Sequence, residues 1–344
     1  MQLPREVVVG SGTSRLVVAI CKKLGFSESV FVVTGPRTFD VAAGGIIDAL
    51  EDSGISADHL LVPSSTMQNV KSVEVKISEL HPQVVLGVGG GTKIDVAKLG
   101  AARKSVPFIA IPTVASHDGI ASPFTSIKGA DKPYSILAEA PMAVIADTDI
   151  IIKASHRYTA SGCGDVVAKL TAVRDWYLAY KVKNEYYGEY AASLALMSAK
   201  LVARNADLMK PENEKGLRVL LEALISCGVA MSIAGSSRPC SGSEHLFSHA
   251  LDMTTASHAL HGEQTGVGTI MMACLQGLNW RRIKSTLEKI GCPTNAKDLG
   301  VEPEDVLTSL VKARLIRPER YTILNEKNLT LDAARKLAKK TKVI

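Results

Sequence analysis

The stretch VVLGVGGGTKIDVAK, residues Val84–Lys98, joins a short apolar run, a glycine triplet and the start of a helical pattern. We expect a buried strand to end at Val88, the glycines Gly89–Gly91 to follow, and a helix to open near Thr92. Glycines let the backbone approach a phosphate, and a helix N-terminus supplies N–H donors. The stretch therefore predicts a phosphate-binding loop. The stretch does not contain a GxGxxG fingerprint. It is not a P-loop either, because Lys93 follows Thr92 and no GK[ST] order occurs.

Residues 1–154 alternate short β-branched runs with helical patterns, which is typical of an α/β domain with a Rossmann-like parallel sheet. The predicted strands are Val7–Val9, Val30–Val33, Leu60–Val62, Val84–Val88, Phe108–Ile111 and Val144–Ile145. Helices are predicted over Ala42–Glu51 and Val70–Leu80. Such sheets bind ligands at the carboxyl ends of their strands. We therefore interpret residues 1–154 as a nucleotide-binding domain.

Residues 155–344 show long amphipathic segments and almost no strand signal, so they predict an all-α second domain. The predicted helices are Asp165–Tyr180, Tyr187–Ala206, Lys215–Ala234, Glu244–Met253, Val267–Asn279 and Leu331–Lys340. A chain of 344 residues exceeds the usual size of one core, which favours two domains. We expect this second domain to bind metal and substrate at a cleft beside the sheet domain.

The composition indicates a cytoplasmic globular protein. The chain is 46% apolar and 22% charged, with a formal net charge of +6 that favours an anionic small substrate. The basic residues are spread along the chain, which argues against a nucleic-acid partner. Six cysteines without a CxxC motif fit a reducing compartment. We expect neither a secretory segment nor a membrane span, and we expect a homo-oligomer.

A second polar loop, IPTVASHDGIASP (Ile111–Pro123), follows the next predicted strand. Its serines, threonine and aspartate serve either as local turn formers or as ligand contacts. The loop lies at the same sheet edge as the glycine triplet, which favours ligand contact. The candidates are Thr113, Ser116, Asp118 and Ser122.

Asp165, in SGCGDVVAK, and a cluster of histidines predict a metal centre. The histidines are His245, His249, His258 and His261. One carboxylate with two histidines matches a catalytic divalent metal that keeps an open coordination position. Spacing alone leaves open which two histidines are ligands, and a buried histidine is often only a hydrogen-bonded core residue. We expect Asp165 at the start of a helix, Glu263 as an acid supporting the ligands, and Cys163 and Cys240 as packing residues.

The motifs GGGTKIDVAK, SHDGIASP, SGCGDVVAK, GSEHLFSHALD and HGEQTG occur in this order between Val84 and Ile270. Together they resemble the sn-glycerol-1-phosphate dehydrogenases of archaea. That group lies within the superfamily of glycerol dehydrogenases, iron-type alcohol dehydrogenases and dehydroquinate synthases. The resemblance implies a dehydroquinate synthase-like fold, one Zn²⁺ per subunit, and NAD(H) or NADP(H). It also implies reduction of dihydroxyacetone phosphate to sn-glycerol 1-phosphate, the first step towards archaeal ether phospholipid backbones.

The resemblance also implies roles for single residues. The metal ligands fall on Asp165, His245 and His261, and the substrate contacts or catalytic groups on Asp118, Asp165 and His249. The implied nucleotide contacts are Gly89, Gly90, Gly91, Thr92, Lys93, Asp95, Thr113, Ser116 and Ser122. His258 matches no role in the family.

The choice of nucleotide is predicted from the segment after the second strand. NAD enzymes often hold the adenosine ribose with an acid there. In this chain the strand ends in Thr34-Gly35-Pro36-Arg37, and the next acid is Asp40. Arg37 is therefore predicted to accept a 2′-phosphate, so that NADPH serves at least as well as NADH.

Three other functions are weighed against this one. A glycerol or related polyol dehydrogenase shares the metal set and differs in its substrate. A dehydroquinate-synthase-like lyase uses NAD only transiently and needs several basic residues around its substrate. A nucleotide-binding regulator would bind ligands without turnover, and it would have no need of the histidine–carboxylate set.

Overall fold

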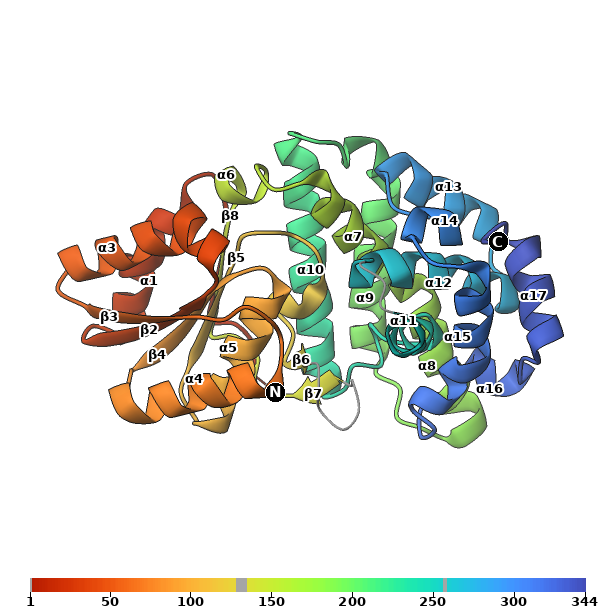
Figure 1. Ribbon diagram of the computed structural model, residues 1–344, viewed down its shortest axis with the longest axis horizontal. Helices are drawn as coiled ribbons and strands as arrows, with labels where there is room; N and C mark the ends of the chain where they lie inside the picture. The colour runs from red at the N-terminus through yellow and green to blue at the C-terminus, as the bar shows by residue number, and fades with distance from the viewer. Residues whose placement is uncertain (1, 128–134, 256–258) are drawn as a thin grey trace. The chain divides into compact units, whose positions relative to one another are not determined.

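The structure is a computed structural model, and it describes residues 2–127, 135–255 and 259–344. By contacts between Cα atoms the chain divides into two compact units, one ending at Ser155 and the other spanning His156–Ile344 (Figure 1). His258 lies outside the described residues.

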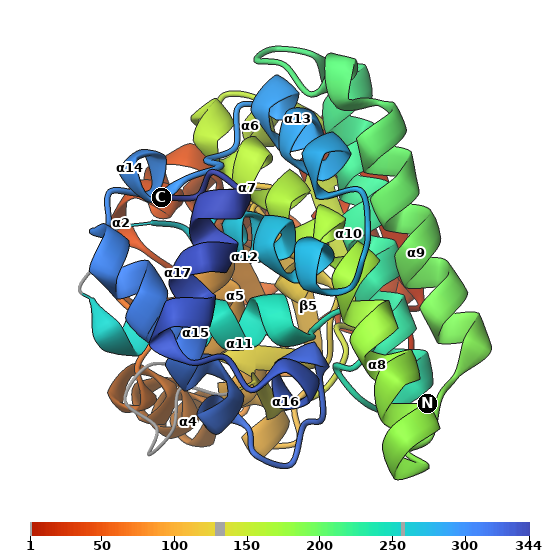
Figure 2. The ribbon, with the colours of Figure 1, turned by 90° about the vertical axis from the view of Figure 1, so that its right-hand side faces the viewer.

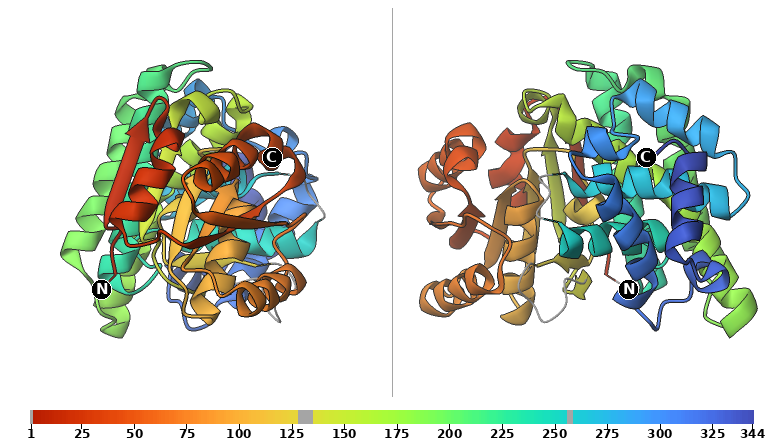
Figure 3. Two further views of the ribbon diagram at one scale, coloured as in Figure 1. Left: turned by 90° about the vertical axis from the view of Figure 1, so that its left-hand side faces the viewer. Right: turned by 45° about the vertical axis from the view of Figure 1, so that its right-hand side comes forward.

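The first unit contains a six-stranded parallel sheet in the order β1-β8-β5-β4-β2-β3 (Figures 1 and 3). Its strands are β1 (Glu6–Gly10), β2 (Ser29–Thr34), β3 (Ser56–Leu61), β4 (Val84–Gly89), β5 (Phe108–Pro112) and β8 (Ala143–Asp147). The predicted parallel α/β sheet is confirmed, and each of the six predicted strands overlaps an observed one. A further pair, β6 (Phe124–Ser126) and β7 (Ser135–Leu137), is antiparallel and was not predicted, because three residues are too few to show an alternating pattern.

Helices cover both faces of this sheet, as Figure 1 shows. On one face lie α1 (Val17–Lys23) and α3 (Gly44–Asp52), whose apolar side chains pack into one core with those of β2, β4 and β5. On the other face lie α4 (Met67–Leu80) and α5 (Gly91–Arg103). Every residue of β4 is buried, as expected for a central strand covered on both sides. Two short helices, α2 (Pro36–Thr38) and α6 (Thr148–Ile151), follow β2 and β8.

The order of the strands fixes where a ligand can bind. After β2 the chain moves outward to β3, then returns to place β4 on the other side of β2 and continues to β5. The direction in which successive strands are added to the sheet therefore reverses between β2 and β4, while the strands themselves stay parallel. In open parallel sheets such a reversal leaves a crevice at the carboxyl ends of the two strands, where ligands bind. The glycine triplet after β4 and Arg37 after β2 both lie at this point.

The second unit consists of helices joined by turns and loops, with no strand among its described residues. Figure 2 shows α11, α12, α15 and α17 grouped together, with α9 alongside α10. The helices are α7 (His156–Val167), α8 (Lys169–Lys183), α9 (Glu189–Arg204), α10 (Glu214–Ala234), α11 (Ser243–Thr254), α12 (His261–Leu275), α13 (Trp280–Ile290), α14 (Ala296–Leu299), α15 (Pro303–Ile316), α16 (Ile323–Lys327) and α17 (Leu331–Lys340).

Two predicted helix boundaries are wrong. Asp165 does not begin a helix, because α7 ends at Val167 and Asp165 lies in its last turn. The helix predicted from Val267 begins earlier, at His261. In both cases glycines suggested a helix end, whereas the structure uses them inside or at the start of helices that pack closely together.

By length and composition, α10 is the one helix among the described residues that is apolar enough to cross a membrane. Within its most apolar stretch, 61% is buried inside the protein. The helix packs against α7 and α9. Its composition is therefore that of a core helix.

The backbones of α7 and α12 come into direct contact at two glycines. A Cβ atom added to Gly164 would overlap the carbonyl of Gly262, and one added to Gly262 would overlap the carbonyl of Ser161. Only residues without a side chain permit this approach. The contact places Asp165, next to Gly164, beside His261, next to Gly262.

We expect Gly262→Ala to destabilise the protein by about 1–3 kcal/mol or more, because the added methyl group forces the two helices apart. The free energy of unfolding in urea measures this effect. Gly45→Ala is a matched control, because Gly45 lies in α3 with open space around it. That substitution should leave the stability unchanged or raise it by up to about 1 kcal/mol. Equal effects of the two substitutions would contradict the proposed backbone contact.

Candidate active site

The glycine triplet forms the junction between β4 and α5. Gly89 has φ of 152°, a conformation that side chains disfavour, and its carbonyl accepts a hydrogen bond from the backbone N–H of Thr113 at 3.0 Å. Gly90 is the N-cap of α5, and no side chain caps that helix end. The first N–H groups of α5 are therefore available to an anion, which fits the predicted nucleotide contacts of Gly89–Gly91 and Thr92.

Lys93 links this loop to the segments after β2 and β3. Its Nζ donates to the carbonyl of Pro63 at 3.3 Å, and its stem fills the space beside Gly35. Burial lowers the pKa of its ammonium group. Arg37, two residues after Gly35, is exposed. The segment after β2 thus carries an exposed cation, and its role in binding a 2′-phosphate stays a prediction.

The second loop is held against α5 by a buried pair of charged residues. Lys98 is fully buried, and its Nζ donates to the carbonyls of Gly119 at 2.6 Å and Phe124 at 2.9 Å. Asp95 lies 3.7 Å from the Lys98 ammonium, and its other oxygen accepts from the N–H of Ser126 at 3.0 Å. Burial lowers the pKa of Lys98, an effect that the nearby carboxylates oppose. Asp95, predicted as a nucleotide contact, is thus also a structural residue of this loop.

The remaining residues of the second loop form local turns or lie at the ends of short elements. The Ser122 hydroxyl accepts from the N–H of Phe124 at 2.9 Å, so it forms a local turn. Thr113 is buried at the end of β5, and Asp118 begins a short 3₁₀ helix. His117, which the sequence analysis did not single out, accepts from the N–H of Gly119 through Nδ1 at 2.8 Å. Its ring lies directly beside Gly91.

The structure brings Asp165, His245 and His261 together from three helices, α7, α11 and α12. One ligand atom from each lies within 4.8 Å of the others. The Nε2 atom of His245 is 3.4 Å from Asp165 Oδ1, and the two imidazole ring centroids are 5.0 Å apart. Asp165 is only 1% exposed. The two imidazoles and the carboxylate that the sequence analysis predicted as ligands therefore converge, and their donor types suit a divalent metal such as zinc.

Neighbouring side chains orient the two imidazoles. Glu244 contacts His245 Nδ1 at 2.8 Å, and the Ser248 hydroxyl contacts His261 Nδ1 at 3.2 Å. Glu244 itself accepts hydrogen bonds from the N–H of Gly242 at 2.6 Å and from the Thr171 hydroxyl. A carboxylate on the far nitrogen of a histidine is the usual support for a metal ligand, because it fixes the tautomer and the orientation of the ring.

Nearby buried charges govern the protonation of Asp165 and His245. Burial alone would raise the pKa of Asp165, but Lys169, whose Nζ is 2.6 Å from Oδ1, and His245 hold it well below its usual range. Burial alone would lower the pKa of His245, but its hydrogen bonds to Asp165 and Glu244 raise it above its usual value. Lys169 was not predicted from the sequence, although its position four residues after Asp165 in a helical pattern was a usable signal.

His249 lies one helical turn after His245, and its ring stacks on that of His261 with centroids 6.0 Å apart. It is not one of the three converging residues. Burial, followed by the positive charges of His245, Arg317 and Arg320, lowers the pKa of His249 to about 3. The residue is therefore beside the candidate metal centre and within the field of two arginines.

The prediction that Glu263 supports the metal ligands is wrong. Its carboxylate forms a two-pronged ion pair with Arg157 at 2.6 and 2.7 Å and accepts from the N–H of Leu260. It thus caps α12, and Glu244 takes the supporting position instead.

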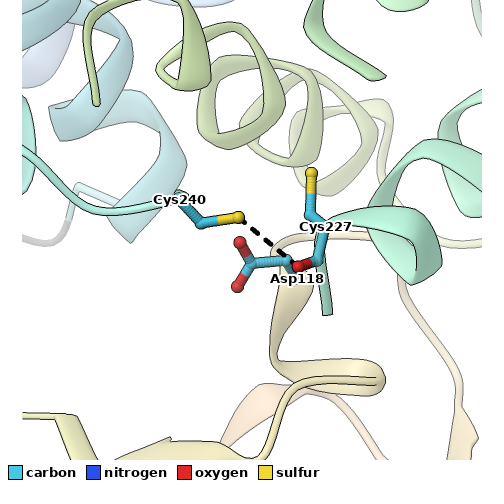
Figure 4. A group of neighbouring side chains, drawn as sticks. All are labelled: Asp118, Cys227 and Cys240. Atoms are coloured by element: carbon cyan, nitrogen blue, oxygen red, sulfur yellow. Dashed lines mark hydrogen bonds between the residues drawn. The ribbon is translucent and has the colours of Figure 1, made fainter. Parts of the chain in front are cut away.

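All six cysteines are thiols. Cys163 and Cys240 are both buried, and the Cys240 thiol donates to the carbonyl of Cys227 at 3.4 Å (Figure 4).

We expect Glu244→Gln to weaken metal binding about 10- to 100-fold, because the loss of the negative charge weakens the hold on His245. Competition with a chromophoric chelator measures the metal affinity. Glu222→Gln is the matched control, since Glu222 is exposed on α10 and forms a surface ion pair with Arg218. An unchanged affinity in the Glu244 variant would show that this carboxylate does not support the site.

Comparison with known proteins agrees with this architecture. Residues 8–155 match the family model described as "Iron-containing alcohol dehydrogenase". Among solved structures, a glycerol dehydrogenase from Schizosaccharomyces pombe superposes with a TM-score of 0.82 at 19% identity, covering 99% of this chain and 91% of that one. A probable glycerol dehydrogenase from Sinorhizobium meliloti gives 0.79 at 18% identity, covering 100% and 99%. The fold is thus that of the glycerol and iron-containing alcohol dehydrogenases.

Sequence similarity narrows the assignment. The glycerol-1-phosphate dehydrogenase (NAD(P)+) of Thermococcus kodakarensis is 52% identical over all of this chain and 98% of its own length. The enzymes of that name from Pyrococcus furiosus and Methanosarcina mazei are also 52% identical, over 99% and 96% of their lengths. The chain belongs to the glycerol-1-phosphate dehydrogenase family.

Proposed function

We propose that this protein uses NAD(P)H to reduce dihydroxyacetone phosphate to sn-glycerol 1-phosphate. The convergence of Asp165, His245 and His261 in one buried group carries the proposal. A glycine loop that leaves the N-terminus of α5 open to an anion supports it. The full-length similarity to proteins named for this activity supports the choice of substrate.

Asp165, His245 and His261 would hold the metal, which we propose to be zinc. When bound, a divalent metal would supply positive charge to the carbonyl oxygen of the substrate. The chain fixes the ligand geometry through Glu244 and Ser248. The second unit thus provides a rigid, largely buried binding site for the reacting carbonyl group.

The glycine loop would bind the pyrophosphate of the nucleotide through the first N–H groups of α5. The nicotinamide supplies the hydride, and the chain supplies orientation. Reduction also adds one proton to the substrate oxygen. We propose that His249, beside the candidate metal centre, and Asp118, in the second loop, contact the substrate. The candidates for the source of the proton are His249, Asp118 and a water relay.

Several further properties are proposed from the family resemblance. The product would provide the glycerol backbone of ether phospholipids. The protein would act in the cytoplasm as a homo-oligomer with one zinc ion per subunit.

The activity is tested by incubating the purified, metal-analysed protein with dihydroxyacetone phosphate and each reduced nicotinamide. We expect steady oxidation of the nucleotide and a product of the sn-glycerol 1-phosphate configuration. Unphosphorylated dihydroxyacetone is the comparison substrate and should be reduced far less efficiently. Preference for that compound would instead indicate a glycerol dehydrogenase, and nucleotide binding without turnover would indicate a regulator.

We expect Asp165→Ala to abolish turnover and metal binding while leaving nucleotide binding largely intact, because the metal group and the glycine loop belong to different units. Metal analysis, NADPH fluorescence and steady-state kinetics measure the three properties. Asp207→Asn is the control, because the Asp207 side chain is 78% exposed. Near-normal activity of the Asp165 variant without bound metal would refute the assignment.

We expect Arg37→Ala to lower the catalytic efficiency with NADPH while that with NADH stays unchanged, because only NADPH carries the 2′-phosphate. The ratio of the two efficiencies is the measured quantity. Lys104→Ala removes another exposed cation, at the far end of α5, and should leave the ratio unchanged. A strict NADH preference that the Arg37 variant retains would exclude this role.

A further inference from the structure

Arg320 is a buried cation that forms no direct ion pair among the described residues, although the more distant carboxylates of Glu185 and Glu319 act on its charge. Its side chain is 8% exposed, and no ion pair involves it among the described residues. It forms two hydrogen bonds to neutral oxygens: Nη1 donates to the carbonyl of Ser241 at 2.6 Å, and Nη2 donates to the Ser237 hydroxyl at 2.8 Å. A buried charge is costly unless it is paired, so an unpaired guanidinium suggests that an anion is missing.

The guanidinium retains hydrogen-bonding capacity for such an anion. An arginine carries five N–H donors in a planar fork that matches phosphate oxygens. Two of these donors are used within the chain. Nε forms no hydrogen bond among the described residues, and it is not one of their buried atoms without a partner, so solvent reaches it. Nε is therefore an unused donor that an incoming anion can reach, while Nη1 and Nη2 are held by Ser241 and Ser237.

A second arginine, Arg317, and the candidate active site lie close to Arg320. Arg317 and Arg320 flank the turn that follows α15, and the N–H of Arg320 donates to the carbonyl of Arg317 at 2.9 Å. Both arginines act electrostatically on His249, and α15 packs directly against α11, which carries His249. His249 in turn stacks on His261. A positively charged patch thus adjoins the place proposed for the substrate.

The other buried arginine near Arg320 already has a carboxylate partner. Arg238, also buried, forms a two-pronged ion pair with Glu185 and donates to the carbonyl of Tyr321. The N-terminus of α11 does not await an anion either, because Asp175 accepts from Ser243 and Glu244 accepts from Gly242. Within the described residues around α11, Arg320 is therefore the buried cation left for an incoming anion.

We propose that Arg320, with the charge of Arg317 beside it, binds the phosphate group of the substrate while His249 lies near the reacting end. This proposal rests on the proposed function for the identity of the phosphorylated substrate. It makes Arg320 the residue that distinguishes a phosphorylated three-carbon ketone from its unphosphorylated counterpart. Hydrogen bonds to a charged group are the strongest that a side chain offers, which suits this discrimination.

The test compares Arg320→Gln with the unmodified protein in three measurements. These are catalytic efficiency with dihydroxyacetone phosphate, catalytic efficiency with dihydroxyacetone, and inhibition by inorganic phosphate. We expect efficiency with the phosphorylated substrate to fall about 10- to 150-fold for each hydrogen bond lost. Efficiency with dihydroxyacetone should stay nearly constant, and inhibition by phosphate should weaken in parallel.

Arg314→Gln is the matched control, because Arg314 is an exposed arginine in the last turn of α15. It should change none of the three measurements. If Arg320→Gln lowers efficiency with both ketones by the same factor and leaves phosphate inhibition unchanged, Arg320 only anchors the loop at Ser237 and Ser241, and the proposal is overturned.

If Arg320→Gln does not fold, Arg320→Lys replaces it, because lysine keeps the charge but lacks the planar fork. Weaker phosphate inhibition in the lysine variant supports the proposal, and equal inhibition overturns it. Calorimetric titration with inorganic phosphate separates this result from the proposed function. A protein that binds phosphate through Arg320 but does not reduce dihydroxyacetone phosphate would sink the function and not the anion site.

Discussion

The backbone contact between α7 and α12 is the constraint on which the candidate metal centre depends. Gly164 and Gly262 carry no side chains, and a methyl group at either position would overlap a carbonyl of the opposite helix. When helices have ordinary side chains at their contact, about 8–10 Å separates the two helix axes. Here those side chains are missing, so the short carboxylate of Asp165 can lie beside His261. The stability of the packing and the geometry of the site therefore have the same origin.

Around this contact, buried charges are arranged in compensating pairs. Lys169 neutralises Asp165, and Glu244 supports His245, so a cluster that would be costly if unpaired is held by short hydrogen bonds. Bringing a divalent cation into the cluster would add positive charge beside an existing ammonium group, and the two carboxylates oppose that repulsion. Arg320 departs from the rule of pairing, which is why we assign it to a ligand and not to the fold.

The first unit also contains a buried pair of opposite charges, and there the pair fixes a loop. Asp95 and Lys98 point from α5 into a buried region, and their hydrogen bonds hold the chain between Gly119 and Ser126. The loop that contains Asp118 is thereby fixed to the helix that begins at the glycine triplet. A nucleotide bound at the start of α5 and a substrate contact in the second loop would consequently share one rigid support.

The sequence by itself determined the parallel sheet, the glycine loop and the identities of the three converging residues. Local periodicity and residue chemistry carry that information, and the resemblance to a known family selected among the histidines. Tertiary structure decided the position of Asp165 at the end of α7, the support of His245 by Glu244, and the isolation of Arg320. These features depend on which helices pack together. Even Glu244, adjacent to His245 in the chain, is held in place by the distant Thr171 hydroxyl, and such long-range contacts leave no periodic trace in the sequence.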